Sequence, residues 1–386
     1  MSARRTIFVS VAEASGDAHA AKLINALRSR MPNARFVGVG GPEMLQAGCE
    51  PAVEGLDLTG GASMLMGAVW KAGYYWRVVR NLRRVISDIK PDVHVPVDSP
   101  AMNWHLAAAA KQAGAKVCYY IAPQVWAWAP WRVKKLARLT DRVACILPFE
   151  PDWLGERGVA GKFVGHPLLE DLPPRADEPA DLLDAWSAGT WRVAMLPGSR
   201  PAELRNHSAA LAVTAEAIRR RWPKAECTFA VGSERAAKLL ESELNGPGAN
   251  AWPVSVGNTG NVISQSHFAV AASGTITLAA AQFGVPMVVF YRLGRLTSNL
   301  LYRALVRTKT FSLVNILAGR RLVPEMMPWY GSHKQLIDQV LDVMDDIGWL
   351  VETRGELLKL TDNLRSDNGK PASENAAEMV AELVGD

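Results

Sequence analysis

Short apolar runs rich in valine and isoleucine alternate along this chain with longer stretches whose apolar residues recur at helical spacing. In the helical stretch 17–30, for example, Leu23, Ala26 and Leu27 fall on one face. Strand, helix and strand in repeated succession predict a parallel sheet with helices on both faces. The strand-like runs of the first half are 6–12, 34–40, 92–97, 116–122 and 142–148.

A segment rich in proline, aspartate and glutamate interrupts this pattern, and strand-like runs resume at residue 192. The length of 386 residues also suits two domains better than one. We therefore expect an α/β protein with two Rossmann-like, doubly wound domains facing a central cleft, with ligands at the carboxyl ends of the strands. The expected parts are a domain at 1–170, a linker at 171–185, a domain at 186–365 and a C-terminal helix at 366–386 that can pack back on the first domain.

Composition and charge narrow the class of protein. Hydrophobic residues make up 49% and charged residues 21% of the chain, as in soluble globular proteins, and the net charge of +5 favours anionic partners. The four cysteines are far apart, which favours reduced thiols over disulfides or a zinc site. The first apolar run is too short for a signal peptide, and no run is long enough to span a bilayer. We expect a cytoplasmic protein, or one that binds a membrane surface without crossing it.

The first strand ends in a loop of small and polar residues that could face a ligand. Ser15 and Gly16 allow close approach of the backbone, Asp17 is expected to start the next helix, and His19 lies in its first turn. A plain strand-to-helix turn capped by Asp17 is the alternative. The spacing is not that of a dinucleotide-binding loop.

Asp98 follows another strand and precedes a helix. A lone aspartate in this position is commonly a helix cap. Doubly wound folds, however, place their working groups at the carboxyl ends of strands, and this favours a carboxylate that faces the cleft.

Two loops of the second half are typical of anion binding. Gly198 and Ser199 open a helix whose amides are expected to point outward, and Arg200 adds donors for a phosphate. The turn Ser273, Gly274 and Thr275 repeats the arrangement; the alternative for both is an ordinary turn between strand and helix. Neither D-x-D nor a metal-spaced histidine pair occurs, so we expect no metal and no cofactor. His166 and Glu325 lie beside prolines in other loops, where structural roles are more common.

Together these loops resemble the lipid-A-disaccharide synthase family, whose members are glycosyltransferases with the GT-B fold. The resemblance runs in order from residue 13 to residue 325, which is far more specific than any single loop. The matching stretches are "EASGDAHAA", "GVGGPEM", "IAPQVWAWAPWRVKKLARLTDRV", "ILPFE", "FVGHPL", "LPGSRPAE", "ASGTITL", "MVVFYR" and "SLVNILAGRRLVPE".

The resemblance implies transfer of diacylglucosamine from UDP to the 6-hydroxyl of 2,3-diacylglucosamine 1-phosphate (lipid X), with inversion. It implies that Asp98 and Arg200 are required, and we expect Asp98 to be the general base, with Glu13 or His19 able to share or take that role. The first domain would hold the acceptor and the second UDP. The expected substrate-binding residues are Ser15, Gly16, Asp17, Gly198, Ser199, Glu203, Ser273, Gly274, Thr275, Tyr291, Arg292, Asn315 and Glu325.

Three positions depart from the family's pattern: Ala101, Ala279 and Pro328. They leave a diverged paralogue as one alternative. Another is a different UDP-N-acetylglucosamine-type transferase or epimerase on the same fold, and a third is a non-catalytic membrane-binding or nucleic-acid-binding protein. The family also includes dimers that exchange halves, so a homodimer is among the expected partners.

Residues 61–86 begin with an apolar stretch and continue with four arginines that are expected to point outward from a helix. Met64, Leu65, Met66 and Trp70 are expected to enter a bilayer, with the arginines on anionic headgroups of the inner membrane. The alternative is a solvated basic face beside a buried stripe.

Tryptophans and cations also meet in "VWAWAPWRVKK". We interpret Trp126 and Trp128 as packing a loop at the cleft wall, and Pro130 as the start of a helix. Nucleic acid is therefore not an expected partner.

Overall fold

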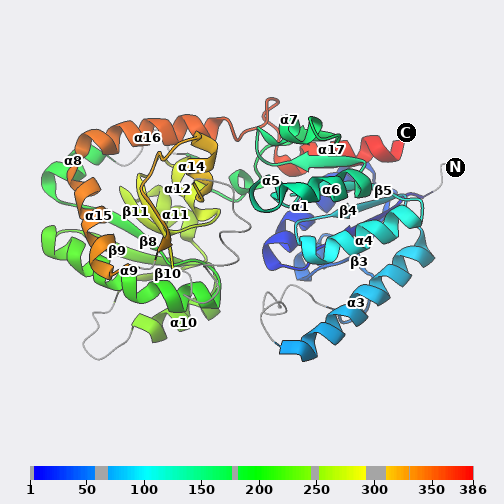
Figure 1. Ribbon diagram of the computed structural model, residues 1–386, viewed down its shortest axis with the longest axis horizontal. Coiled ribbons are helices and arrows are strands. Elements are labelled where there is room, and N and C mark those ends of the chain that lie inside the picture. Colours follow the sequence, from blue (N-terminus) through cyan, green and yellow to red (C-terminus); the bar gives the residue numbers. More distant parts are fainter. Residues whose placement is uncertain are drawn as a thin grey trace. The chain divides into compact units, whose positions relative to one another are not determined.

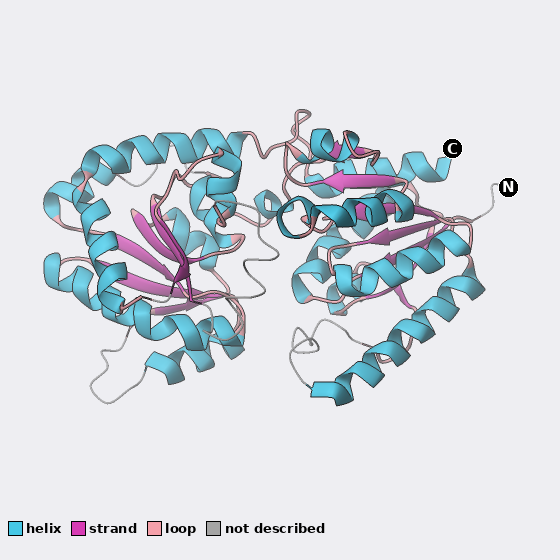
Figure 2. Ribbon diagram, viewed as in Figure 1, coloured by secondary structure: helices cyan, strands magenta, loops and turns pink. Residues whose placement is uncertain are grey.

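The computed structural model describes residues 4–56, 68–175, 181–244, 252–292, 310–329 and 331–385 (Figure 1). The chain forms two compact units: residues 1–170 together with 364–386, and residues 171–363. Each unit encloses a parallel sheet between helices, as Figure 2 shows. The predicted fold class, with two parallel sheets of Rossmann type, is confirmed.

The sheet of the first unit has the order β3-β2-β1-β4-β5-β6-β7, and every pair in it is parallel. Its central strands are buried on both faces, which explains their continuous apolar sequences. The strands are β1 (Thr6–Ser10), β2 (Arg35–Val39), β3 (Glu50–Pro51), β4 (Val93–Pro96), β5 (Lys116–Tyr120), β6 (Arg142–Cys145) and β7 (Gly161–Phe163).

Helices α3 and α4 pack together over one face of this sheet, with α6 beside α4. Val78, Val79, Leu82 and Ile86 of α3 are all buried, because their spacing places them on one side of the helix. The helices of this unit are α1 (Ala14–Arg30), α2 (Pro42–Gln46), α3 (Ala68–Ile89), α4 (Pro100–Gln112), α5 (Val125–Trp128), α6 (Val133–Leu139), α7 (Glu150–Gly155) and α17 (Ala372–Gly385).

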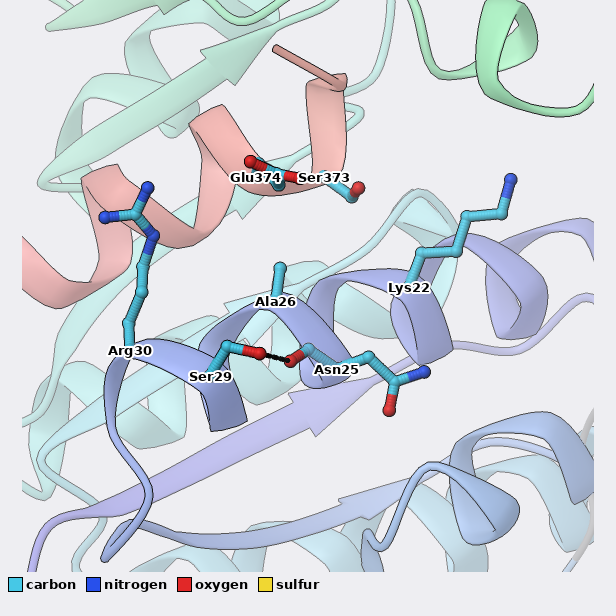
Figure 3. A pocket seen from close by; sticks show the side chains of 7 residues that line it. All are labelled: Lys22, Asn25, Ala26, Ser29, Arg30, Ser373 and Glu374. Atoms are coloured by element: carbon cyan, nitrogen blue, oxygen red, sulfur yellow. Dashed lines mark hydrogen bonds between the residues drawn. The ribbon is translucent and has the colours of Figure 1, made fainter.

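The last helix of the chain, α17, belongs to this first unit and packs against α1 (Figure 1). Glu170 accepts hydrogen bonds from the amide and hydroxyl of Ser373, at 2.8 and 3.0 Å, which hold the start of α17. A pocket of about 540 Å³, lined mostly by polar residues, lies between the two helices (Figure 3). Its cations are paired: Lys22 with Glu170 at 3.9 Å, and Arg30 with Glu378 at 3.4 Å.

The sheet of the second unit has the order β10-β9-β8-β11-β12-β13 and is also parallel throughout. Its core includes the fully buried rings of Trp191, Phe229, Phe268 and Phe290. The strands are β8 (Arg192–Leu196), β9 (Glu226–Val231), β10 (Val254–Val256), β11 (Phe268–Ala272), β12 (Met287–Arg292) and β13 (Glu325–Trp329).

Helices α9 and α10 pack together in the second unit, and α12 packs on α16. Helix α8 begins inside the segment predicted as a linker, because Asp181 caps the amides of Leu183 and Asp184. The helices are α8 (Leu182–Ala188), α9 (Pro201–Arg221), α10 (Glu234–Leu244), α11 (Thr259–Ser264), α12 (Ile276–Gln282), α14 (Leu313–Ala318), α15 (His333–Asp345) and α16 (Ile347–Asp362).

Within the described ranges, no helix has both the length and the apolar character that a membrane span requires.

Candidate active site

The strand order of the first sheet reverses between β1 and β4, and ligands of doubly wound proteins bind where the order reverses. Two loops that contain predicted site residues begin there. Glu13 ends the loop after β1, Ser15 and Gly16 follow it in the first turn of α1, and the loop after β4 carries Asp98. The two loops are joined, since the amide of Ala12 donates to Oγ of Ser99 at 3.1 Å. The topology therefore brings the predicted groups of the first unit together.

Asp98 and Ser99 both have left-handed backbone conformations, with φ of 48° and 47°. Neither is glycine, so each conformation costs about 1–2 kcal/mol. The carbonyl of Asp98 accepts hydrogen bonds from the hydroxyl of Tyr119 and from Nδ2 of Asn103, both at 2.8 Å, and its amide donates to the carbonyl of Tyr120 at 3.1 Å. Strained backbone fixed in this way is typical of functional sites.

Asp17 is not placed as predicted. Helix α1 begins at Ala14, with Glu13 at the N-cap, so Asp17 does not start the helix. Its carboxylate is buried and accepts hydrogen bonds from the amides of Gly41, Glu43 and Met44, at 2.9, 2.9 and 3.2 Å. This side chain fixes the loop after β2, and its contact with substrate stays a prediction.

His19 is half-buried in α1 and lies close to His166. Burial, together with the charge of His19, lowers the pKa of His166 to about 4. Nδ1 of His166 accepts a hydrogen bond from the amide of Leu168 at 3.2 Å, so His166 holds a turn. The role expected for His19 stays a prediction.

In the second sheet the order reverses between β8 and β11, and both predicted anion loops begin there. The carboxylate of Glu203 is buried and accepts hydrogen bonds from the amides of Ser199 and Arg200, at 2.9 and 3.0 Å. The expectation of outward-pointing amides is therefore wrong for Ser199, and Glu203 organises the loop. The side chain of Arg200 is 65% exposed, and its Nη1 lies 3.5 Å from Oε1 of Glu203.

Gly198 is required by this arrangement. Its φ is 105°, and a Cβ atom at this position would lie 2.4 Å from Oε2 of Glu203.

His207 supports the same loop and was not predicted from the sequence. Its Nδ1 lies 2.8 Å from the carbonyl of Pro197, and its Nε2 accepts the amide of Arg292 at 3.2 Å. These partners fix a neutral ring with the proton on Nδ1, and burial lowers the pKa of His207. The sequence indicated this supporting role of His207 only by its place four residues after Glu203, on the same face of α9.

Tyr291 and Arg292 end β12 beside this loop. The hydroxyl of Tyr291 donates to Oε1 of Glu203 at 3.3 Å, and burial and then Glu203 raise the pKa of the tyrosine. The guanidinium of Arg292 lies over the ring of Trp329, 5.6 Å from its centre.

The turn after β11 is exposed at Gly274 and Thr275 and half-buried at Ser273. The carbonyl of Gly274 accepts from the amide and hydroxyl of Thr277, at 3.2 and 2.8 Å. Anion binding by this turn stays a prediction.

Asn315 and Glu325 form a closed hydrogen-bonding network. Asn315 is fully buried; it accepts the amides of Leu322 and Val323 and donates to Glu325 at 2.9 Å. Glu325 also accepts the amides of Phe311 and Ser312, at 2.7 and 3.0 Å. Both side chains hold the segment around α14 in place, and their contact with substrate stays a prediction.

Several predicted contacts fall outside what the structure describes. These are Met64, Leu65 and Met66, and the side chains of Trp70, Trp128 and Pro328. In the part of the chain that is described, no cluster of three or more acidic, histidine or cysteine side chains could hold a metal ion.

The family described as lipid-A-disaccharide synthetase matches residues 7–346, most of the chain. This chain belongs to the lipid-A-disaccharide synthase family. A lipid-A-disaccharide synthase from Geobacter metallireducens is 32% identical over 99% of this chain and 98% of its own length. One from Anaeromyxobacter sp. (strain K) is 36% identical over 88% of each chain. The resemblance inferred from the loops is thereby confirmed, and membership of the family makes the chain a glycosyltransferase.

Solved structures agree on the architecture of this family member. A UDP-GlcNAc 2-epimerase from Neisseria meningitidis bound to UDP-GlcNAc matches over 98% of both chains, with a TM-score of 0.61 and 12% identity. The glycotransferase of kitacinnamycin matches over 99% of both chains, with a TM-score of 0.61 and 14% identity. At these identities the likeness shows the fold alone, which is GT-B.

Proposed function

We propose that this chain transfers 2,3-diacylglucosamine from UDP to the 6-hydroxyl of 2,3-diacylglucosamine 1-phosphate (lipid X). The products would be UDP and the β-1,6-linked lipid A disaccharide 1-phosphate. Membership of the family supports the reaction. The assignment of residues rests mainly on the strained turn at Asp98, whose carbonyl accepts hydrogen bonds from two side chains. Such backbone strain persists only where the surrounding structure enforces it.

Asp98 is assigned as the general base. Inversion by a single displacement needs a group that accepts the proton of the attacking hydroxyl as the bond to the anomeric carbon forms. Asp98 follows the central strand β4 at the point where strand order reverses. Glu13 stands at the N-cap position of α1 on the adjoining loop, where its side chain makes no capping hydrogen bond, and is the alternative base.

Arg200 is assigned to the diphosphate of the donor. Negative charge builds on UDP as it leaves, and an exposed guanidinium presents a fork of donors for phosphate oxygens. Glu203 takes the two loop amides, so the stabilisation is expected to come mainly from the Arg200 side chain. No metal ion is needed in this scheme.

We also assign an anionic membrane surface as a partner of the first unit. Trp131 is 58% exposed, Trp76 of α3 is 50% exposed, and the ring of Trp76 lies 5.0 Å from that of His105 on α4. Four arginines on the same helix as Trp76 are also exposed: Arg77, Arg80, Arg83 and Arg84. Exposed tryptophans next to cations are typical of proteins that bind anionic lipid from one side.

One assay tests the proposed reaction. The protein is incubated with UDP-2,3-diacylglucosamine and lipid X, and UDP and disaccharide are measured together. Formation of both in equal amounts is expected. UDP without disaccharide would indicate a hydrolase, and a change of the donor's sugar would indicate an epimerase; either result overturns the proposal.

A vesicle experiment tests the membrane surface separately. The double variant Trp76→Ser/Trp131→Ser should bind vesicles of phosphatidylglycerol and phosphatidylethanolamine more weakly than the wild-type chain. The matched control is Trp186→Ser, which removes a 39% exposed tryptophan from the second unit. Equal losses of vesicle binding in both variants would contradict the assignment.

The formation of a homodimer stays a prediction.

A further inference from the structure

Buried polar side chains behind Asp98 form one continuous network. Ser10 at the end of β1 donates to Oδ1 of Asn103 at 2.7 Å, and its Oγ lies 2.8 Å from Nε2 of His94 on β4. Nδ2 of Asn103 lies 3.2 Å from the carbonyls of Ser10 and Val97 and 2.8 Å from that of Asp98. Strands β1 and β4 and helix α4 are thereby linked behind the turn.

The direction of each hydrogen bond in this network is fixed. Because Ser10 donates to Asn103, its oxygen accepts from His94, which must carry its proton on Nε2. Nδ2 of Asn103 then shares its two hydrogens among the carbonyls of Ser10, Val97 and Asp98. His94 is fully buried, and burial lowers its pKa to about 3, so the ring stays neutral. A network with one allowed orientation is a rigid support.

The network acts on the turn where the backbone is strained. Two donors, the hydroxyl of Tyr119 and the amide of Asn103, meet at the carbonyl of Asp98. Tyr119 lies on β5 and is fully buried, so its hydroxyl has a fixed position. Without these donors the carbonyl of Asp98 would lose both side-chain hydrogen bonds that offset the strain of the left-handed turn.

We infer that Tyr119 and Asn103, supported by Ser10, are positioning residues that aim the Asp98 carboxylate by holding its carbonyl in a left-handed turn. The inference deepens the proposed function and rests on it. Neither side chain needs to touch substrate. A displacement of the base by about 1 Å can cost up to 100-fold in rate, so the network would affect turnover and not donor binding.

The sharpest test removes one oxygen atom. Tyr119→Phe deletes the 2.8 Å hydrogen bond to Asp98 and leaves the ring in place. We expect kcat to fall about tenfold with the KM for the UDP-sugar unchanged. The matched control is Thr140→Val, which also deletes a 2.8 Å hydrogen bond from a hydroxyl to a backbone carbonyl in the same unit, that of Leu136. It should lower the melting temperature similarly and leave kcat unchanged.

A double-mutant cycle separates positioning from general support. In an Asp98→Asn background, Tyr119→Phe should have no further effect on kcat, because the group that it aims is gone. An equal loss in both backgrounds overturns the inference while leaving the proposed base intact. Full activity of Asp98→Asn alone overturns the proposed base instead.

If Tyr119→Phe does not fold, the same double-mutant cycle is carried out with Ser10→Ala.

A crystal structure provides a test that does not depend on activity. A crystal structure of Tyr119→Phe/Asn103→Ser, which lacks both donors, should show Asp98 outside the left-handed region. Retention of a φ near 48° there would overturn the inference whatever the kinetics.

Discussion

The loop after β4 and the loop after β8 each lie where the strand order of their sheet reverses, but they are built in opposite ways. In the first, Asp98 and Ser99 adopt left-handed conformations without glycine, and side chains donate to the backbone carbonyl of Asp98. In the second, Gly198 takes the left-handed conformation at φ 105°, and the Glu203 carboxylate accepts the backbone amides. The first loop stores strain, whereas the second is relaxed.

The difference follows from what each loop presents. A proton acceptor must be aimed within a fraction of an ångström, and this favours a short side chain on a rigid, strained turn. A guanidinium on a long side chain can adjust its position to reach phosphate oxygens, so the loop that bears it needs only to be stable. Four changes test this contrast, from the largest expected effect to the smallest.

Replacing Asp98 by asparagine should give the largest loss. The variant keeps the shape of the turn but cannot accept a proton, so kcat should fall by about 10²–10⁴-fold. Product formation is measured with both substrates saturating, and circular dichroism checks the fold. Activity within a factor of two of wild type would show that Glu13 or another group is the base.

Replacing Arg200 should cost somewhat less, about 10²–10³-fold in kcat for Arg200→Ala. Arg200→Lys should recover only part of this, because an ammonium cannot bind two phosphate oxygens in the same way. The control is Arg205→Ala, an exposed arginine further along α9. An equal loss in the control would mean that net charge, not the loop, is being measured.

Glycine substitutions test whether the second loop depends on the left-handed conformation of Gly198. Gly198→Ala should destabilise the fold by about 1–3 kcal/mol, because the new Cβ would overlap the Glu203 carboxylate at a positive φ. Gly274→Ala is the matched control, since a Cβ at that turn meets no atom within 4 Å. Urea denaturation measures both. Similar free energies of unfolding for the two variants would show that the second loop is not built around Gly198.

The smallest effect concerns pH, through His207 behind the second loop. Its folded-state pKa lies below the ordinary value, so the unfolded chain binds more protons and stability falls as pH drops below about 6.5. His207→Gln cannot titrate and should lose less stability than wild type between pH 7 and pH 5. Urea unfolding at a series of pH values measures this, and identical slopes would contradict it.

Much of the fold was predictable from particular residues. The apolar runs around Ile7, Val95, Val193 and Val270 predicted parallel strands because both faces of such strands are buried. Helical spacing also predicts a buried stripe on α3 of Tyr75, Val78, Val79, Leu82 and Ile86; the four aliphatic side chains are buried, whereas Tyr75 is half-buried. Helix starts were harder, since Glu13 is an unusual N-cap and Asp17 a common one.

The candidate site was predictable only in part. Loop position and residue type selected Asp98 and Arg200, but they could not distinguish ligand contacts from groups that hold the loops. Asp17, Glu203, Asn315 and Glu325 all proved to be bonded to backbone amides of the protein itself. A carboxylate or amide near a loop has the same sequence pattern whether it binds a ligand or holds the loop.

The order of apolar runs and loops by itself determined the parallel architecture, the family and the two loops in which chemistry is expected. Only the tertiary structure decided which polar side chains already form hydrogen bonds within the protein. Ser10, His94, Asn103 and Tyr119 are distant in sequence, and each alone reads as an ordinary buried polar residue. They form one support for Asp98 because β1, β4 and β5 are neighbours in the sheet, a long-range pairing that no local pattern encodes.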